Sequence, residues 1–90
     1  MSQHYIPAKT ENTTVIVGYD RPLDHFFATI FVDGDVVYFS DGTDSVVKLR
    51  KEIAPYADLS VAVAKELVGE RAGTVAHPMI KCVDHRPQAS

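Results

Sequence analysis

Two apolar segments joined by Asp33-Gly34 constrain the fold of this chain more than any other feature. Residues 26–32 and 36–40 are rich in β-branched and aromatic side chains, which favour strands. The Asp-Gly pair between them suits a type I′ turn, because both central residues of that turn need positive φ and glycine adopts it freely. The sequence therefore predicts a tight β-hairpin.

A two-residue loop also fixes which residues of the hairpin lie opposite each other. The predicted pairs are Val32–Asp35, Phe31–Val36, Ile30–Val37, Thr29–Tyr38 and Ala28–Phe39. Successive side chains on a strand point to opposite faces, so one face would carry Phe26, Ala28, Ile30, Val37 and Phe39. The other face would carry Phe27, Thr29, Phe31, Val36 and Tyr38. Both faces are apolar, whereas a sheet with one face in water alternates apolar and polar residues.

Two further segments have the character of strands. Residues 13–19 are rich in β-branched side chains and predict a strand before the hairpin. Residues 74–83 predict a last strand, although Pro78 cannot donate a ladder hydrogen bond and therefore favours a sheet edge. The sequence leaves open whether this last strand joins the sheet beside the first strand or beside the third.

Helical periodicity follows the hairpin. A short helix over about residues 44–54, with Thr43 or Asp44 as its N-cap, ends before a proline. A second helix begins after Asp58 or Ser60 and runs to about residue 72, where Gly73 suits the left-handed C-terminal position. We expect the second helix to be buried around most of its circumference, since Val61, Ala62, Ala64 and Val68 widen its stripe of leucine and valine.

The expected fold class is α+β, with the element order β-β-β-α-α-β. A three- to four-stranded antiparallel sheet would carry a helical hairpin packed on one face. Ninety residues leave room for one domain, which we assign to residues 13–84. Residues 1–12 are polar and aperiodic and are expected to form a flexible arm, and residues 85–90 a flexible tail.

Composition excludes several classes of partner. The formal net charge of −3 argues against a nucleic-acid-binding protein, which is normally strongly basic. No apolar run approaches the roughly 18 residues needed to span a bilayer, so no membrane partner is expected. The one cysteine, Cys82, cannot form an intramolecular disulfide, and a cytoplasmic location is expected. No residue set predicts a cofactor.

The second apolar face is the basis of the favoured hypothesis. Two short helices can cover only one side of the sheet. The other side therefore predicts a non-enzymatic interaction module, and the expected partner is a second copy of the chain in a homodimer. The expected interface is Phe27, Thr29, Phe31, Val36 and Tyr38. The alternative is a small inhibitor or regulatory protein whose acidic residues bind a basic protein partner. Those residues are Asp33, Asp35, Asp41 and Asp44.

One further cluster has metal-compatible residue types, namely His77, Cys82 and His85. Their spacing is poor, because the two histidines share a parity on a strand and the cysteine points to the opposite face. No Cys-x-x-Cys pair accompanies them. A metal-dependent or Cys–His enzyme is therefore the least favoured hypothesis, and the sequence assigns no catalytic residue.

Overall fold

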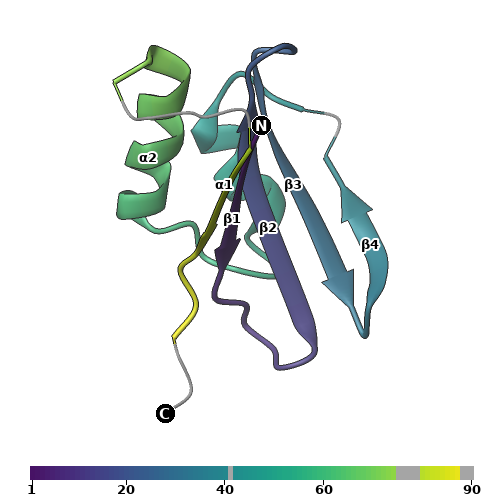
Figure 1. Cartoon of the computed structure of the whole chain (residues 1–90). Helices are drawn as coiled ribbons and strands as arrows, with labels where there is room; N and C mark the ends of the chain where they lie inside the picture. The colour runs from purple at the N-terminus through teal and green to yellow at the C-terminus, as the bar shows by residue number, and fades with distance from the viewer. Residues whose placement is uncertain (41, 75–79, 88–90) are drawn as a thin grey trace.

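The computed structural model describes residues 1–40, 42–74 and 80–87. It contains a five-stranded sheet in the order β4-β3-β2-β1-β5 and two helices (Figure 1). Along the chain the elements are β1 (Ser2–Ile6), β2 (Thr13–Asp20), β3 (His25–Val32), β4 (Asp35–Phe39), α1 (Val46–Ile53), α2 (Val61–Ala72) and β5 (Lys81–Asp84).

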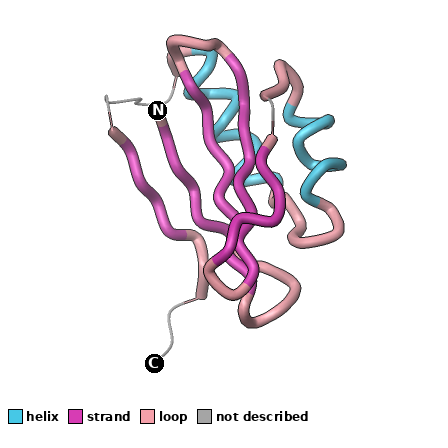
Figure 2. The backbone as a smooth tube through the Cα atoms, turned by 90° about the vertical axis from the view of Figure 1, so that its right-hand side faces the viewer, coloured by secondary structure: helices cyan, strands magenta, loops and turns pink. Residues whose placement is uncertain are grey.

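The α+β class with a helical pair on the sheet is confirmed. Figure 2 shows both helices on one side of the sheet. The number and sense of the strands differ from the prediction, because the sheet has five strands and is mixed. The pairs β1–β2, β2–β3 and β3–β4 are antiparallel, whereas β1 and β5 are parallel. Neither helix in the described part of the chain is long and apolar enough to cross a bilayer.

The extra strand comes from the segment predicted to be a flexible arm. Residues 2–6 form β1, which pairs with β2 on one side and β5 on the other. Its helix-facing residues are Ser2, His4 and Ile6, all buried. Two of these three side chains are polar, so the alternation that marks a half-buried strand is missing from the sequence. The final strand, β5, pairs with β1, so it lies beside neither the first predicted strand (β2) nor the third (β4), the two positions that the sequence left open.

The predicted tail also begins later than residue 85. The His85 backbone N–H donates to the Tyr5 carbonyl at 2.8 Å, which extends the β1–β5 contact by one residue. The Arg86 guanidinium then lies over the Tyr5 ring, 4.9 Å from its centroid. Residues 85 and 86 are therefore part of the packed structure, while residues 88–90 lie outside the described residues.

The hairpin has the predicted turn but not the predicted register throughout. Asp33 and Gly34 have φ of 53° and 84°, as a type I′ turn requires. The pairs Val32–Asp35 and Phe31–Val36 are confirmed. A β-bulge then shifts the register. The three pairs predicted beyond it are wrong, and the observed pairs are Ile30–Tyr38 and Thr29–Phe39.

This bulge reverses the faces of two aromatic residues. Because paired residues share a face, Tyr38 lies on the helix side with Ile30 and packs against the core. Phe39 lies on the helix-free side with Thr29. Each of these two residues was predicted to lie on the opposite face, because the prediction assumed a hairpin without a bulge.

Serine caps begin both helices. Ser45 Oγ accepts a hydrogen bond from the Lys48 backbone N–H at 3.3 Å, so the predicted caps Thr43 and Asp44 are wrong by one or two residues. The Ser60 prediction is confirmed, since its Oγ accepts from the Val63 N–H at 3.2 Å. Gly73 ends α2 with φ of 81°, also as predicted.

The core lies between the helices and one side of the sheet. Its strand residues are Ile6, Val15, Val17, Tyr19, Phe26, Ala28 and Ile30. Its residues from the helices and their connection are Leu49, Ile53, Ala57, Leu59, Val63 and Leu67. The expectation that α2 would be buried around most of its circumference is wrong, because Val61 and Val68 are 68% and 47% exposed.

Candidate functional site

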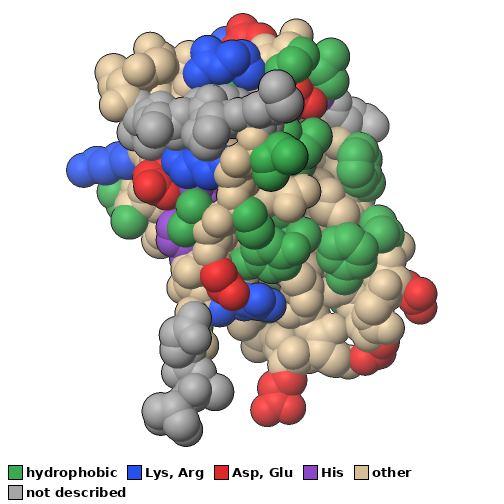
Figure 3. All heavy atoms as spheres, viewed as in Figure 1, with side chains coloured by type: hydrophobic (Ala, Val, Ile, Leu, Met, Phe, Trp, Pro, Cys, Tyr) green, Lys and Arg blue, Asp and Glu red, His purple; other side chains and the backbone are tan. Residues whose placement is uncertain are grey.

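An apolar patch occupies the side of the sheet that the helices leave uncovered. The strand register places Phe27, Phe31 and Thr29 of β3 on this side, together with Val36 and Phe39 of β4. Ile16 of β2 pairs with Thr29 and adds to the patch. Figure 3 shows hydrophobic side chains gathered on this side of the molecule. We call these residues, Ile16, Phe27, Thr29, Phe31, Val36 and Phe39, the apolar patch.

A glycine shapes the centre of the patch. Gly18 of β2 pairs with Phe27, and a Cβ built on Gly18 would lie 2.5 Å from the Phe27 ring and in hard contact with the Ser2 carbonyl. The Phe27 ring therefore lies against the space that a side chain would take. This packing explains why Phe27 is only partly exposed although no helix covers it.

Exposure increases toward the sheet edge. Phe27 and Phe31 are partly buried, whereas Val36 and Phe39 of the edge strand are 56% and 68% exposed. Four of the five predicted interface residues lie in the patch. The fifth, Tyr38, lies on the other side of the sheet because of the bulge, and Phe39 takes its place.

The predicted acidic residues do not form one surface. Asp33 and Asp35 lie at the turn, at one end of β4, and Asp44 lies beyond the other end. The five residues of β4 span about 17 Å, so the two groups are well separated. Asp33 also accepts a hydrogen bond from Asn12 at 2.6 Å. Asp41 lies outside the described residues.

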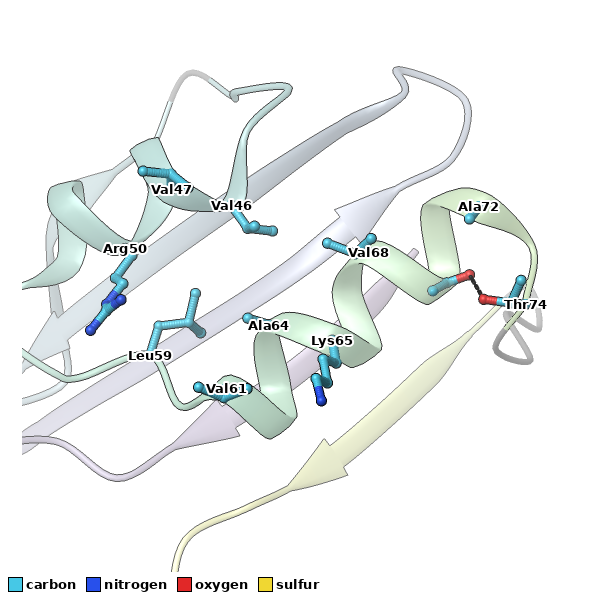
Figure 4. A pocket seen from close by; sticks show the side chains of 11 residues that line it. Val46, Val47, Arg50, Leu59, Val61, Ala64, Lys65, Val68, Ala72 and Thr74 are labelled. Carbon is cyan, nitrogen blue, oxygen red and sulfur yellow. Dashed lines mark hydrogen bonds between the residues drawn. The ribbon is translucent and has the colours of Figure 1, made fainter.

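A second apolar surface lies between the helices (Figure 4). It is a groove of about 390 Å³. Valines of both helices supply most of its apolar lining, together with the charged residues Arg50 and Lys65. The valines are Val46, Val47, Val61 and Val68. The groove exists because α2 presents apolar residues outside the core as well as toward it.

A buried carboxylate organises the opposite end of the sheet. Glu70 of α2 is fully buried and accepts hydrogen bonds from Ser2 Oγ at 2.5 Å, His4 Nε2 at 2.9 Å and Lys81 Nζ at 2.7 Å. Burial by itself would raise the pKa of Glu70, but hydrogen bonds from His4, Lys81 and Ser2 outweigh it and lower the pKa to about 2. The carboxylate therefore joins β1, β5 and α2.

A second carboxylate lies one helical turn before Glu70. Glu66 Oε2 lies 3.5 Å from His4 Nδ1 and 3.7 Å from His85 Nε2. The two histidines are themselves in contact, with 2.8 Å between His4 Nδ1 and His85 Nε2. Glu66 Oε2 is buried and has no hydrogen-bond partner. We call His4, Glu66 and His85 the imidazole–carboxylate cluster.

The predicted metal ligands do not come together in the described residues. Cys82 is exposed and pairs with Gln3, which places it on the helix-free side of the sheet. His85 lies in the imidazole–carboxylate cluster, and His77 lies outside the described residues. Sequence reasoning missed His4 and Glu66. The spacing of Glu66 and Glu70, four residues apart on one helix face, was the available signal.

Comparison with known proteins does not assign this chain to a family. No family model matches it, and searches of curated proteins and of solved structures find no similar protein. The function is therefore argued from the residues and their geometry.

Proposed function

We propose that this protein is a non-enzymatic interaction module that self-associates through the apolar patch. The proposal rests on one observation, the band of uncovered apolar side chains that runs from Phe27 and Phe31 to Val36 and Phe39. Contiguous apolar patches on a protein surface commonly mark interaction sites. The partner is a second copy of this chain, related by a two-fold axis.

The size of the sheet face supports a second copy as the partner. Five strands spaced about 4.8 Å apart, each about 13–27 Å long, give a projected face on the order of 500 Å². Side-chain relief adds to this area, and a stable interface needs about 800 Å² of accessible surface from each partner. Two such faces can therefore supply an interface of ordinary size.

The geometry of the patch supports a face-to-face contact rather than a continuous sheet. β4 is short, at five residues, and carries a bulge. Both features disfavour edge-to-edge pairing of strands. The patch residues are uncharged, so a two-fold contact between identical faces brings no like charges together at its centre. The separated aspartates at the ends of β4 give the acidic-inhibitor alternative less support.

A cytoplasmic location is part of this proposal. Cys82 is the one cysteine of the chain and is exposed. Since it lies outside the apolar patch, the proposed association does not depend on a disulfide.

Two substitutions of equally exposed residues test the proposal. Phe39 and Val61 are each 68% exposed, but Phe39 lies in the apolar patch and Val61 in the interhelical groove. We expect size-exclusion chromatography with light scattering to give a dimer mass for the unmodified chain and for Val61→Asp. We expect Phe39→Asp to give a monomer mass with an unchanged circular dichroism spectrum.

Two outcomes would contradict the proposal. A monomer mass for the unmodified chain up to about 200 μM, a concentration that would populate even a weak dimer with a Kd near 100 μM, would remove it. Dissociation by Val61→Asp but not by Phe39→Asp would instead place the contact at the groove between the helices.

A further inference from the structure

The imidazole–carboxylate cluster has no part in the proposed self-association. It lies where β1, α2 and the end of β5 meet, on the helix side of the sheet, whereas the apolar patch lies on the other side. His4 is fully buried, and His85 and Glu66 are 26% and 38% exposed. Three side chains with ligand-type atoms therefore converge close to the surface.

Hydrogen bonding determines which nitrogen of His4 is available. Its Nε2 lies 2.9 Å from a Glu70 oxygen, and an ionised carboxylate can only accept, so Nε2 carries a proton. In the neutral ring Nδ1 then carries a lone pair, which accepts the hydrogen bond from His85 Nε2 at 2.8 Å and lies 3.5 Å from Glu66 Oε2. A carboxylate that holds the outer N–H of a histidine in this way is typical of metal-binding histidines.

Glu66 supplies an independent observation. Its Oε2 atom is buried and accepts no hydrogen bond, although both imidazoles lie within 3.7 Å. A buried acceptor without a donor costs free energy unless a cation or another partner satisfies it. The unsatisfied oxygen lies beside the lone pair of His4 Nδ1.

We propose that His4 Nδ1, Glu66 Oε2 and His85 Nε2 bind a divalent transition-metal ion such as Zn²⁺. Two imidazoles and one carboxylate form a donor set that suits Zn²⁺, Ni²⁺ and Cu²⁺ better than Mg²⁺ or Ca²⁺, which prefer oxygen ligands. Glu70 is the supporting residue that orients His4, and Ser2 and Lys81 hold Glu70 in turn.

The spacing of the three ligand atoms suits such an ion with little rearrangement. Tetrahedral Zn²⁺ with bonds of about 2.1 Å places its ligand atoms about 3.4 Å apart. The distances from Glu66 Oε2, 3.5 and 3.7 Å, are close to this value. The 2.8 Å between the imidazole nitrogens must widen by about 0.6 Å, which replaces their hydrogen bond by two metal bonds.

A cavity reaches one side of the cluster at His85. It has a volume of about 460 Å³ and is lined by His85, by residues after β1 and by residues at the start of α2. Three protein ligands leave a fourth position for water or another small donor. Each ligand atom binds the ion through a lone pair and therefore carries no proton in the complex.

Isothermal titration of the full, untagged and chelator-treated chain with ZnCl₂ tests this site. We expect one ion per chain. His85→Gln and Glu66→Gln are expected to weaken binding by at least about 10-fold, the effect of losing even an outer-shell partner. His25→Gln and Cys82→Ser are the matched controls, since neither residue lies in the cluster, and both should bind as the unmodified chain does.

Thermal unfolding distinguishes lost binding from a lost fold. Zn²⁺ should raise the unfolding temperature of the unmodified chain and of both controls by more than that of His85→Gln or Glu66→Gln. If one of these two variants fails to fold, the other still tests the metal site, because Glu66 lies in α2 and His85 follows β5. Absence of a 1:1 site, equal binding by the folded cluster variants, or loss of binding in Cys82→Ser would each overturn the proposal. The zinc measurements do not depend on whether the chain is a monomer or a dimer, so failure of the metal site would not contradict the proposed self-association.

Discussion

The two ends of the sheet are built in opposite ways. At the β3–β4 end, apolar side chains such as Phe39 and Val36 remain exposed. At the β1–β5 end, the polar side chains of Ser2, His4 and Glu70 are fully buried and joined by hydrogen bonds. Apolar surface can be covered by another molecule at no cost in hydrogen bonds, whereas a buried polar group needs its partners within the chain. The first end is therefore suited to association, and the second to holding a fixed set of ligand atoms.

The largest effect is expected from removing the central carboxylate. Glu70→Ala leaves the Lys81 ammonium and the His4 N–H without their buried acceptor. We expect the free energy of unfolding to fall by about 3–5 kcal/mol, the usual cost of breaking a buried charged pair. Urea unfolding measures it, with Glu11→Ala, an exposed residue, as the control. A loss below about 1 kcal/mol would mean that the network does not hold this end together.

Acid should destabilise the same end. The folded-state pKa of Glu70 is about 2, below its ordinary value of 4.5, so its contribution is complete above about pH 5 and is lost as the pH falls toward 2. The shift corresponds to about 3 kcal/mol. Urea unfolding at several pH values should show this decline in the unmodified chain and a flatter profile in Glu70→Gln. Equal slopes for the two proteins would assign the acid sensitivity to other groups.

Adding one methyl group at Gly18 tests the packing beneath the apolar patch. A Cβ at this position would meet the Ser2 carbonyl and the Phe27 ring, so Gly18→Ala should cost about 2–3 kcal/mol of stability. Gly73→Ala is the comparison, because nothing lies within 4 Å of the Cβ site there and the cost of its positive φ is only about 1 kcal/mol. A smaller loss at Gly18 than at Gly73 would contradict the observed packing.

The smallest difference concerns two neighbouring aromatic residues. Tyr38 packs against the core, whereas Phe39 is 68% exposed. At protein concentrations below the dissociation constant of the proposed dimer, Tyr38→Ala should lower the free energy of unfolding by about 1–2 kcal/mol and Phe39→Ala by no more than about 0.5 kcal/mol. Only Phe39→Ala should weaken association. A larger loss of unfolding free energy for Phe39→Ala than for Tyr38→Ala would contradict the bulge and support a uniform hairpin register.

Local signals in the sequence predicted a good part of the fold. The Asp33-Gly34 turn, the Ser60 cap and the Gly73 helix end depend on backbone conformations that few residues favour, so the residue types identify them. The α+β class follows from the order of these local elements. Side-chain alternation along the hairpin predicted four of the six residues of the apolar patch, whereas Phe39 was exchanged with Tyr38 and Ile16 was not predicted.

Features that depend on distant contacts could not be predicted. The bulge in β4 leaves the residue types of the hairpin unchanged, so the sequence gives no sign of the shifted register. β1 buries Ser2 and His4 because Glu70, more than sixty residues away, satisfies them. A polar strand of this kind resembles a flexible arm until its partners are known. The imidazole–carboxylate cluster was missed for the same reason.

Contacts between copies of the chain test the central claim most directly. In a sample that mixes isotope-labelled and unlabelled protein, isotope-filtered nuclear Overhauser spectroscopy reports proton contacts across the interface alone. Self-association through the apolar patch predicts intermolecular contacts of the Phe39 and Phe31 rings with Val36 methyl groups. Intermolecular contacts confined to Val61 and Val68 in the interhelical groove, or none at a concentration well above the dissociation constant, would contradict it.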